Sequence, residues 1–222
     1  MKFRRPQFIP LAFIIGTTLL LVSLGLWQAQ RLVWKNNLIA RIETAQAEPA
    51  LTAWQDSADY RNIEIEGTFI HDRSLHLVGR PKGSSMGFFI LTPLQLEDGK
   101  TVLVNRGWAP EGEKIAMPGA SLIRGVVRPA REKRYFSPDN QPEKNVWFYE
   151  DIPAMSRVTN LTLENGVIEA VGTPEKGIYP QPGDGKISLR NDHLGYAITW
   201  FALAAIGLIM FAIYHRIPER KA

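Results

Sequence analysis

Two long stretches without a charged side chain constrain this sequence more than any other feature. One covers the 25 residues between Arg5 and Arg31, and the other covers the 21 residues between His193 and His215. A helix needs about 20 apolar residues to cross a hydrocarbon core about 30 Å thick. We therefore predict transmembrane helices at residues 8–27 and 193–214, with a domain of residues 28–192 between them.

A cleaved signal peptide is the alternative interpretation of the first stretch. Lys2, Arg4 and Arg5 form a basic start, and residues 45–47 spell AQA, which matches a signal peptidase pattern. However, the apolar region of a signal peptide is about 7–15 residues long and is followed closely by the cut. Here the stretch is longer, and Arg31, Lys35 and Arg41 precede Ala47. We favour an anchor that is retained.

The distribution of charge predicts the orientation in the membrane. Residues 1–7 and 215–222 hold six of the 26 Lys and Arg but one of the 22 Asp and Glu. Short basic flanks stay in the cytoplasm, so both tails are predicted to be cytoplasmic and the domain to lie outside. The 20 basic and 21 acidic residues that remain nearly cancel. This balance argues against a nucleic-acid partner, which needs a basic patch on the folded domain.

The region between the two spans is predicted to begin with a helical segment and to continue as β structure. Residues 28–47 contain no Gly or Pro, so we expect the first helix to continue to Ala47, before Pro49. From residue 60 onward, short apolar runs alternate with turn residues, and Asp98-Gly99 is a strong hairpin signal. We predict strands near residues 63–69, 75–78, 88–96, 101–108, 122–127, 146–149 and 167–171, and a short helix near 153–158. The fold class is therefore α+β: two transmembrane helices flank a mainly antiparallel β domain, for which a small barrel is one candidate form.

Few chemical motifs occur in the domain. Residues 83–87 match G-x-S-x-G, but a nucleophile elbow needs a helix after Ser85, and the sequence there is typical of a strand. His71 and His76 lack a carboxylate cluster, so we do not expect a metal site there. Cysteine is absent, which excludes disulfides and thiolate ligands. We predict no catalytic residues and no enzymatic activity.

The most informative residues lie where the two spans leave the membrane on the outer side. His193 opens the second span, and Tyr196 and Trp200 follow on one helical face. At the corresponding end of the first span the sequence places Trp27, Gln28 and Arg31. An aromatic belt at the membrane interface explains such residues without any further function.

A haem site is the functional alternative. A neutral imidazole is a good axial ligand for haem iron, and Arg31 and Arg190 would lie where propionates need charged partners. We expect free space for the porphyrin between the paired spans. Small residues below it would let the helices approach closely; they are Gly16, Ser23, Ala202, Ala205 and Gly207.

Five ordered blocks make the chain resemble the surfeit-locus-protein-one family of cytochrome c oxidase assembly factors. They are LGLWQ at residues 24–28, TPL at 92–94, VLVNRGWAP at 102–110, DNQPEKN at 139–145 and LRNDHLGY at 189–196. The resemblance implies a factor that binds haem a as cargo and assists its insertion into subunit I of haem–copper oxidase, with haem a synthase as a further candidate partner. The proposed iron ligand of the family corresponds to His193. The resemblance also includes a family signature, Asn105-Arg106-Gly107-Trp108, whose role the sequence does not indicate.

Two other functions compete with the haem carrier. In the first, the chain is a haem-independent scaffold whose outer domain grips oxidase subunits, so substitutions at Arg106 or Trp108 would impair assembly. In the second, it is a membrane-tethered hydrolase that uses Ser85. The first span begins near residue 8, which leaves no room for a mitochondrial transit peptide. We therefore expect a bacterial inner membrane, with the domain in the periplasm.

Overall fold

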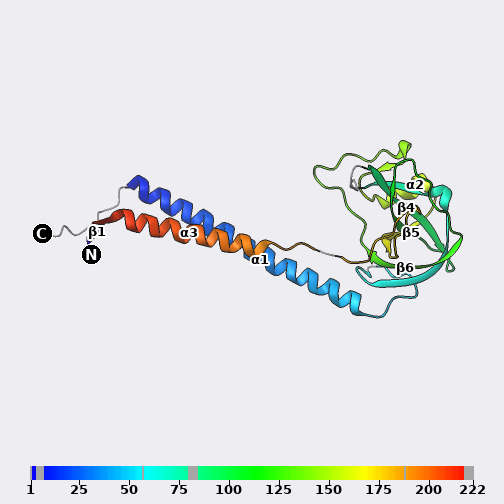
Figure 1. Ribbon diagram of the computed structural model, residues 1–222, viewed down its shortest axis with the longest axis horizontal. Helices are drawn as coiled ribbons and strands as arrows, with labels where there is room; N and C mark the ends of the chain where they lie inside the picture. Colours follow the sequence, from blue (N-terminus) through cyan, green and yellow to red (C-terminus); the bar gives the residue numbers. More distant parts are fainter. Residues whose placement is uncertain (1, 4–7, 57, 80–84, 188, 218–222) are drawn as a thin grey trace. The chain divides into compact units, whose positions relative to one another are not determined.

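The computed structural model describes residues 2–3, 8–56, 58–79, 85–187 and 189–217, and the chain divides into two compact units (Figure 1). We call the first unit, Met1–Arg41 with Ser188–Ala222, the helix pair. We call the second unit, Ile42–Ile187, the β domain. The predicted tail residues Arg4, Arg5, Arg220 and Lys221 lie outside the described part of the chain.

The helix pair is built from two long apolar helices. Helix α1 spans Phe8–Ala47 as one continuous helix, so the predicted extension beyond the first span is present. Helix α3 spans His193–His215. Beyond them, the short strands β1 (Lys2–Phe3) and β9 (Arg216–Ile217) pair antiparallel, which brings the two tails together at one end of the pair.

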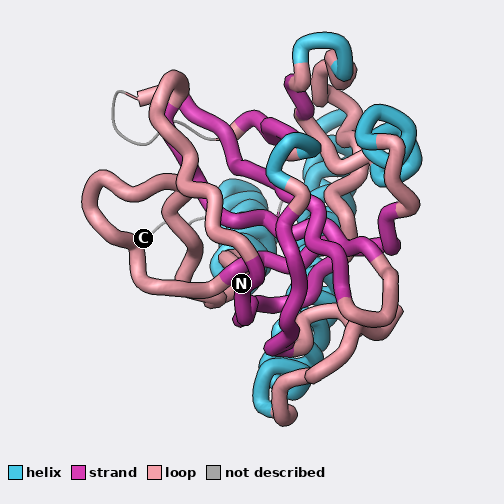
Figure 2. Tube along the Cα trace, turned by 90° about the vertical axis from the view of Figure 1, so that its right-hand side faces the viewer, coloured by secondary structure: helices cyan, strands magenta, loops and turns pink. Residues whose placement is uncertain are grey.

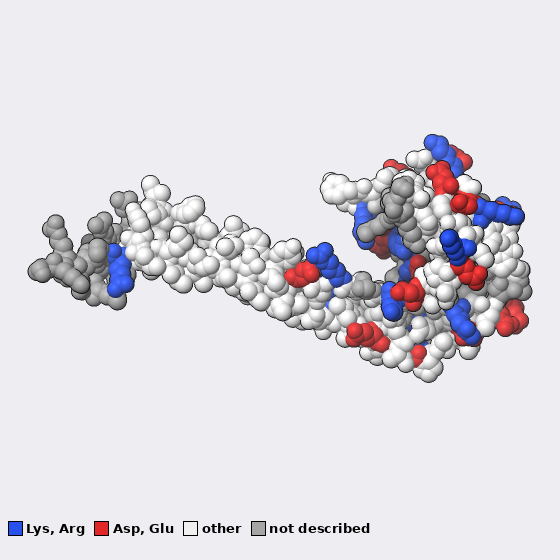
Figure 3. All heavy atoms as spheres, in the orientation of Figure 1, with Lys and Arg blue, Asp and Glu red and all other residues white. Residues whose placement is uncertain are grey.

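The surface of these helices suits a lipid environment. Their most apolar segments have a mean hydropathy of 2.2, yet only 6% and 11% of those segments is buried. A core helix of a soluble protein would bury most of such a surface, whereas lipid solvates it. On the face drawn in Figure 3, the helix pair carries no charged side chain over most of its length. The chain is a membrane protein with two transmembrane helices.

The β domain is a closed barrel of five strands with two more strands at one side. The order is β2-β6-β8-β5-β4-β3-β7, and β2 also pairs with β4, which closes the barrel. The β5–β8 and β3–β7 pairs are parallel and the other pairs are antiparallel. Figure 2 shows the strands grouped at the centre of the domain with loops around them. The strands are β2 (Asn62–Phe69), β3 (Leu75–Val78), β4 (Gly87–Leu96), β5 (Thr101–Pro110), β6 (Ala120–Arg128), β7 (Val146–Trp147) and β8 (Leu163–Ala170).

Two apolar clusters hold this domain together. One contains alternating residues of β2, β4 and β5, with Trp54 packed against it. The other contains Trp147 and Met155, both fully buried, the latter from helix α2 (Ile152–Thr159). Strand β5 contributes to both clusters, and all but its last residue is buried, because it lies between β4 and β8. This burial on both sides explains the apolar run at residues 102–104 of the strand.

Local chemistry explains where α2 begins and ends. The Asp151 carboxylate accepts a hydrogen bond from the Ala154 backbone N–H at 3.0 Å, a common N-cap arrangement. Asn160 ends the helix with φ 55°, a left-handed conformation that Asn tolerates better than most residues. A short helix was predicted at this position.

The candidate motifs of the domain have structural explanations. Of the G-x-S-x-G segment, residues 83 and 84 lie outside the described residues; Ser85 is exposed, and β4 begins at Gly87. A strand rather than a helix therefore follows the serine, which does not match a nucleophile elbow. The His71 Nε2 atom lies 2.6 Å from the Pro118 carbonyl oxygen, and His76 is half-buried against the Phe88 ring at 5.4 Å.

Candidate functional site

A hydrogen bond between the two helices defines the most distinctive site of the helix pair. The Nδ1 atom of His193, the first residue of α3, lies 2.7 Å from the Oε1 atom of Gln28 on α1. An amide oxygen only accepts hydrogen bonds, so Nδ1 is the donor. In the neutral ring, Nε2 then carries a lone pair, and it has no hydrogen-bond partner among the described residues. Both side chains are half-buried.

A second polar contact joins the same helix to the segment before α3. The Asn191 side-chain amide donates to Asn36 Oδ1 at 2.8 Å. The Oδ1 atom of Asn191 is buried and has no hydrogen-bond partner within the part of the chain that the structure describes. The sequence does not predict this contact. Asn36 and Asn191 each lie outside an apolar run, and no pattern distinguishes either of them from a surface residue.

Below the histidine, small residues bring the helices into direct contact. Gly25 is buried, and a β-carbon there would lie 2.7 Å from the Phe201 ring. Ala197 and Ala204 are buried, and Gly207 approaches Ile14. These contacts fill the space where we expected a porphyrin, so that expectation was wrong.

The choice of small contact residues was also wrong. Ala202 and Ala205 are exposed, and Ser23 is exposed and bonds to Leu19 of its own helix. A β-carbon at Gly16 would have no described atom within 4 Å, whereas one at Gly207 would lie 3.5 Å from Ile14 of the partner helix.

The other predicted site residues differ in their exposure and in their partners. Trp27 and Tyr196 are both more than half exposed, and Trp200 is half-buried. The guanidinium of Arg31 lies over the Trp34 ring, 4.5 Å from its centre. Arg190 is exposed and forms an ion pair with Asp192. The structure therefore brings Gln28 and His193 together and leaves the aromatic and basic side chains open to a ligand or to lipid.

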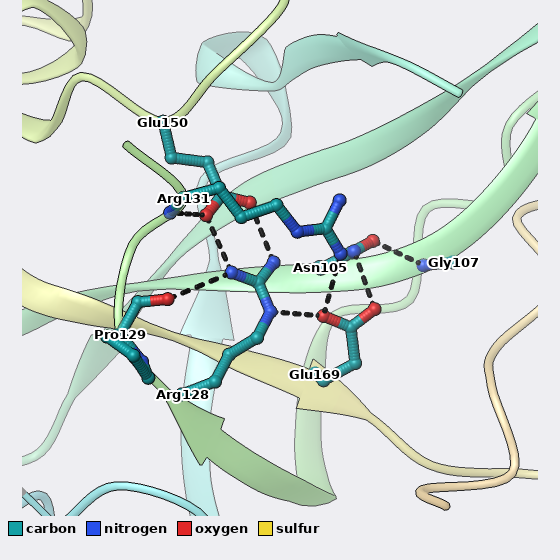
Figure 4. Close-up of polar contacts among 7 residues, drawn as sticks. All are labelled: Asn105, Gly107, Arg128, Pro129, Arg131, Glu150 and Glu169. Atoms are coloured by element: carbon teal, nitrogen blue, oxygen red, sulfur yellow. Dashed lines mark hydrogen bonds and ion pairs between the residues drawn. The ribbon is translucent and has the colours of Figure 1, made fainter. Parts of the chain in front are cut away.

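The β domain contains a buried charged network that sequence analysis did not predict (Figure 4). Arg128 binds both oxygens of Glu150 at 2.6 Å and contacts Glu169 at 2.6 Å. Glu169 accepts a hydrogen bond from Asn105 at 2.8 Å. The network joins β5, β6 and β8 to the segment before α2. Its residues are far apart in the sequence, and no local pattern connects them.

Charge pairing outweighs burial in this network. Burial alone would raise the pKa of Glu150, but hydrogen bonds from Arg128, its positive charge and the Arg131 N–H hold that pKa below its ordinary value. Burial lowers the pKa of Arg128, and its two carboxylate partners raise it further than burial lowers it. Glu150 and Arg128 therefore stay charged at neutral pH, which is the arrangement a buried pair needs.

The signature at residues 105–108 is part of this architecture. The Asn105 side chain accepts the Gly107 N–H at 3.0 Å, and Gly107 has φ 115°. Arg106 is buried, donates to the Ala116 carbonyl oxygen and lies over the Phe69 ring. Trp108 is buried and exchanges backbone hydrogen bonds with Gln181. These residues hold the barrel and its connector together and are not available as a docking surface.

Comparison with known proteins agrees with this architecture. The family model described as "SURF1 family" matches residues 15–205, which include α1 from residue 15 onward, the whole β domain and the first 13 residues of α3. The chain belongs to the SURF1 family. It is 34% identical to the SURF1-like protein of Rickettsia felis over 91% of this chain and 95% of that protein. It is 33% identical to human Surfeit locus protein 1 over 82% of this chain and 70% of that protein.

Membership of the SURF1 family confirms the resemblance found in the sequence. SURF1 proteins are known in general as cytochrome oxidase assembly factors. The family therefore points to an assembly factor rather than an enzyme. The matched region ends at residue 205, so both Gln28 and His193 lie inside it.

Proposed function

We propose that this protein binds haem a as cargo and assists its insertion into subunit I of haem–copper oxidase. The observation that carries the proposal is the state of His193. Its Nδ1 donates to Gln28 and its Nε2 retains a free lone pair, as an axial ligand of haem iron requires. The ring is half-buried at the end of a transmembrane helix, so it remains accessible.

The neighbourhood of His193 suits the other parts of haem a. The apolar surfaces of Trp27 and Tyr196 are exposed beside it and match a flat macrocycle and an isoprenoid tail. Arg31 and Arg190 are exposed cations within one helical turn of Gln28 and His193 in sequence and match propionates. Since the helices contact each other directly, the macrocycle would lie on the outside of the helix pair rather than between the helices.

Absorption spectroscopy tests the proposal. The protein is purified in detergent from a haem-a-producing host, together with His193→Ala and the matched control His215→Ala at the other end of α3. We expect haem absorption in wild type and in His215→Ala, and its loss in His193→Ala. Colourless wild-type protein would overturn the proposal.

The haem-independent scaffold is separated from this function by oxidase assembly. Because Arg106 and Trp108 are buried, substituting them would unfold the β domain and would not test docking. The informative variant is again His193→Ala. A scaffold would support normal oxidase assembly and haem a content with this variant, whereas a haem carrier would leave subunit I deficient in haem a.

The cellular setting is part of the same proposal. We place the protein in a bacterial inner membrane, with both tails in the cytoplasm and the β domain in the periplasm. The basic tails support this orientation. Haem a synthase is the natural donor class for such a carrier, because a hydrophobic haem would pass between membrane proteins.

A further inference from the structure

We propose that Gln28 is a positioning residue for haem binding, whose side-chain carbonyl holds His193 in the tautomer that leaves Nε2 free for iron. This inference rests on the proposed function. It assigns to α1 a direct part in preparing a ligand that α3 carries.

The geometry supports this role. The 2.7 Å contact joins residues that are 165 positions apart, so the pairing of the helices creates it. The hydrogen bond made by one ring nitrogen determines which nitrogen carries the proton. Without an acceptor at Nδ1, a neutral histidine favours the proton on Nε2, where it occupies the lone pair that iron needs. Ligating histidines generally donate their other N–H to an oxygen acceptor in this way.

The competing explanation is that the Gln28–His193 hydrogen bond only holds the two helices together. The chain offers a matched control for this explanation. Asn36 and Asn191 also form an amide hydrogen bond at 2.8 Å between α1 and the segment before α3. That contact involves no imidazole. Asn36→Leu removes this hydrogen bond and shows what the loss of one contact between the helices does. Gln28→Leu removes a contact between the helices and also the acceptor of His193.

The first measurement uses protein without haem. Nitrogen-15 NMR of histidine-labelled full-length protein in detergent reports the tautomer of each of the four histidines. In wild type and Asn36→Leu we expect His193 with a protonated Nδ1 and an unprotonated Nε2. In Gln28→Leu the proton should shift to Nε2. A wild-type His193 protonated on Nε2 would overturn the inference without any reference to haem.

The second measurement is a titration with haem a, followed by absorption and by the midpoint reduction potential. Gln28→Leu should weaken binding about 10- to 100-fold, the usual effect of removing a partner of a metal ligand. Gln28→Glu keeps an acceptor and should restore binding. Its negative charge should lower the reduction potential, because it makes the imidazole a stronger donor to ferric iron. Asn36→Leu should match wild type in both properties.

The two proposals fail in different ways. Wild type that binds haem a through His193, with Gln28→Leu of equal affinity, would overturn the role of Gln28 and leave the haem carrier intact. Equal losses of haem a affinity in Gln28→Leu, Gln28→Glu and Asn36→Leu would indicate that these hydrogen bonds only hold the helices together. That result would also overturn the role of Gln28. Wild type that binds no haem a would overturn the proposed function and this inference together.

Discussion

At Gly107 the backbone of β5 passes the backbone of Gln181 without space for any side chain. A β-carbon at this position would lie 1.9 Å from the Gln181 carbonyl oxygen, and φ is 115°. The two strands of chain exchange hydrogen bonds of 2.9 and 2.8 Å between Trp108 and Gln181. Glycine is thus the residue that lets the connector at 172–185 attach to the barrel.

We predict that Gly107→Ala destabilises the β domain by more than about 2 kcal/mol, since it adds both a backbone strain and a steric overlap. Denaturant unfolding of the full-length protein in detergent, followed by near-UV circular dichroism, measures the change. Gly112→Ala is the control, because Gly112 also has a positive φ, 82°, but open space around it. Equal losses in the two variants would mean that the approach to Gln181 is unimportant.

His193 illustrates what a sequence reveals about a single residue. A histidine that borders an uncharged run stands out, and Gln28 directly follows the other predicted span, so both residues were predicted to lie near each other. Which ring nitrogen remains free depends on a contact between two helices, and no sequence pattern encodes it. The tautomer therefore emerged only from the structure.

At the scale of elements, the buried network around Arg128 predicts an acid-sensitive barrel. The pKa of Glu150 in the folded domain lies below the ordinary value of 4.5. Its carboxylate therefore contributes stability that is fully present above about pH 4.5 and is lost as the pH falls through the folded-state pKa. The side chain of Glu150 is fully buried and that of Arg128 is 13% exposed, so little solvent screens this pair.

We expect Glu150→Gln to lower the free energy of unfolding by roughly 3 kcal/mol at neutral pH, because it leaves a buried Arg128 partly uncompensated. The difference from wild type should shrink as the pH falls below about 4.5. Urea unfolding between pH 3 and 7, followed by the fluorescence of buried Trp147, measures both. Glu64→Gln, which breaks the exposed pair with Arg124, should change stability little. A Glu150→Gln difference that is constant over this pH range would contradict the account.

Local signals predicted most elements but not how they join. Alternating residues and turns located β2 through β6, and Asp98-Gly99 located the β4–β5 hairpin, because these signals lie within a few residues. Closure of the barrel through β2–β4 and the parallel β5–β8 pair joins distant segments, which leave no local trace. The contact face of α3 was predicted wrongly as Ala202 and Ala205, because a lipid-exposed helix is apolar on every side and has no amphipathic period.

At the scale of the whole molecule, the chain consists of two compact units with different surfaces. The β domain has its own core, and the helix pair carries the exposed apolar surface and the Gln28–His193 contact. Pairing of β1 with β9 places the two tails at the same end of the helix pair. The absence of cysteine makes the membrane orientation directly measurable.

We predict that Lys176→Cys reacts with a membrane-impermeant maleimide in spheroplasts, because this exposed residue belongs to the β domain, which we propose to be periplasmic. Arg216→Cys in the tail is expected to react only after the membrane is permeabilised. Mass spectrometry of the labelled protein measures both. The reverse pattern would show that the basic tails do not determine the orientation.

The most direct measurement of the central claim is pulsed electron paramagnetic resonance of ferric haem a bound to protein labelled with nitrogen-15 histidine. Axial ligation by His193 predicts a hyperfine coupling between the iron spin and a histidine nitrogen, retained in His215→Ala and absent in His193→Ala. Haem-loaded wild type without any coupling to a histidine nitrogen would contradict the account.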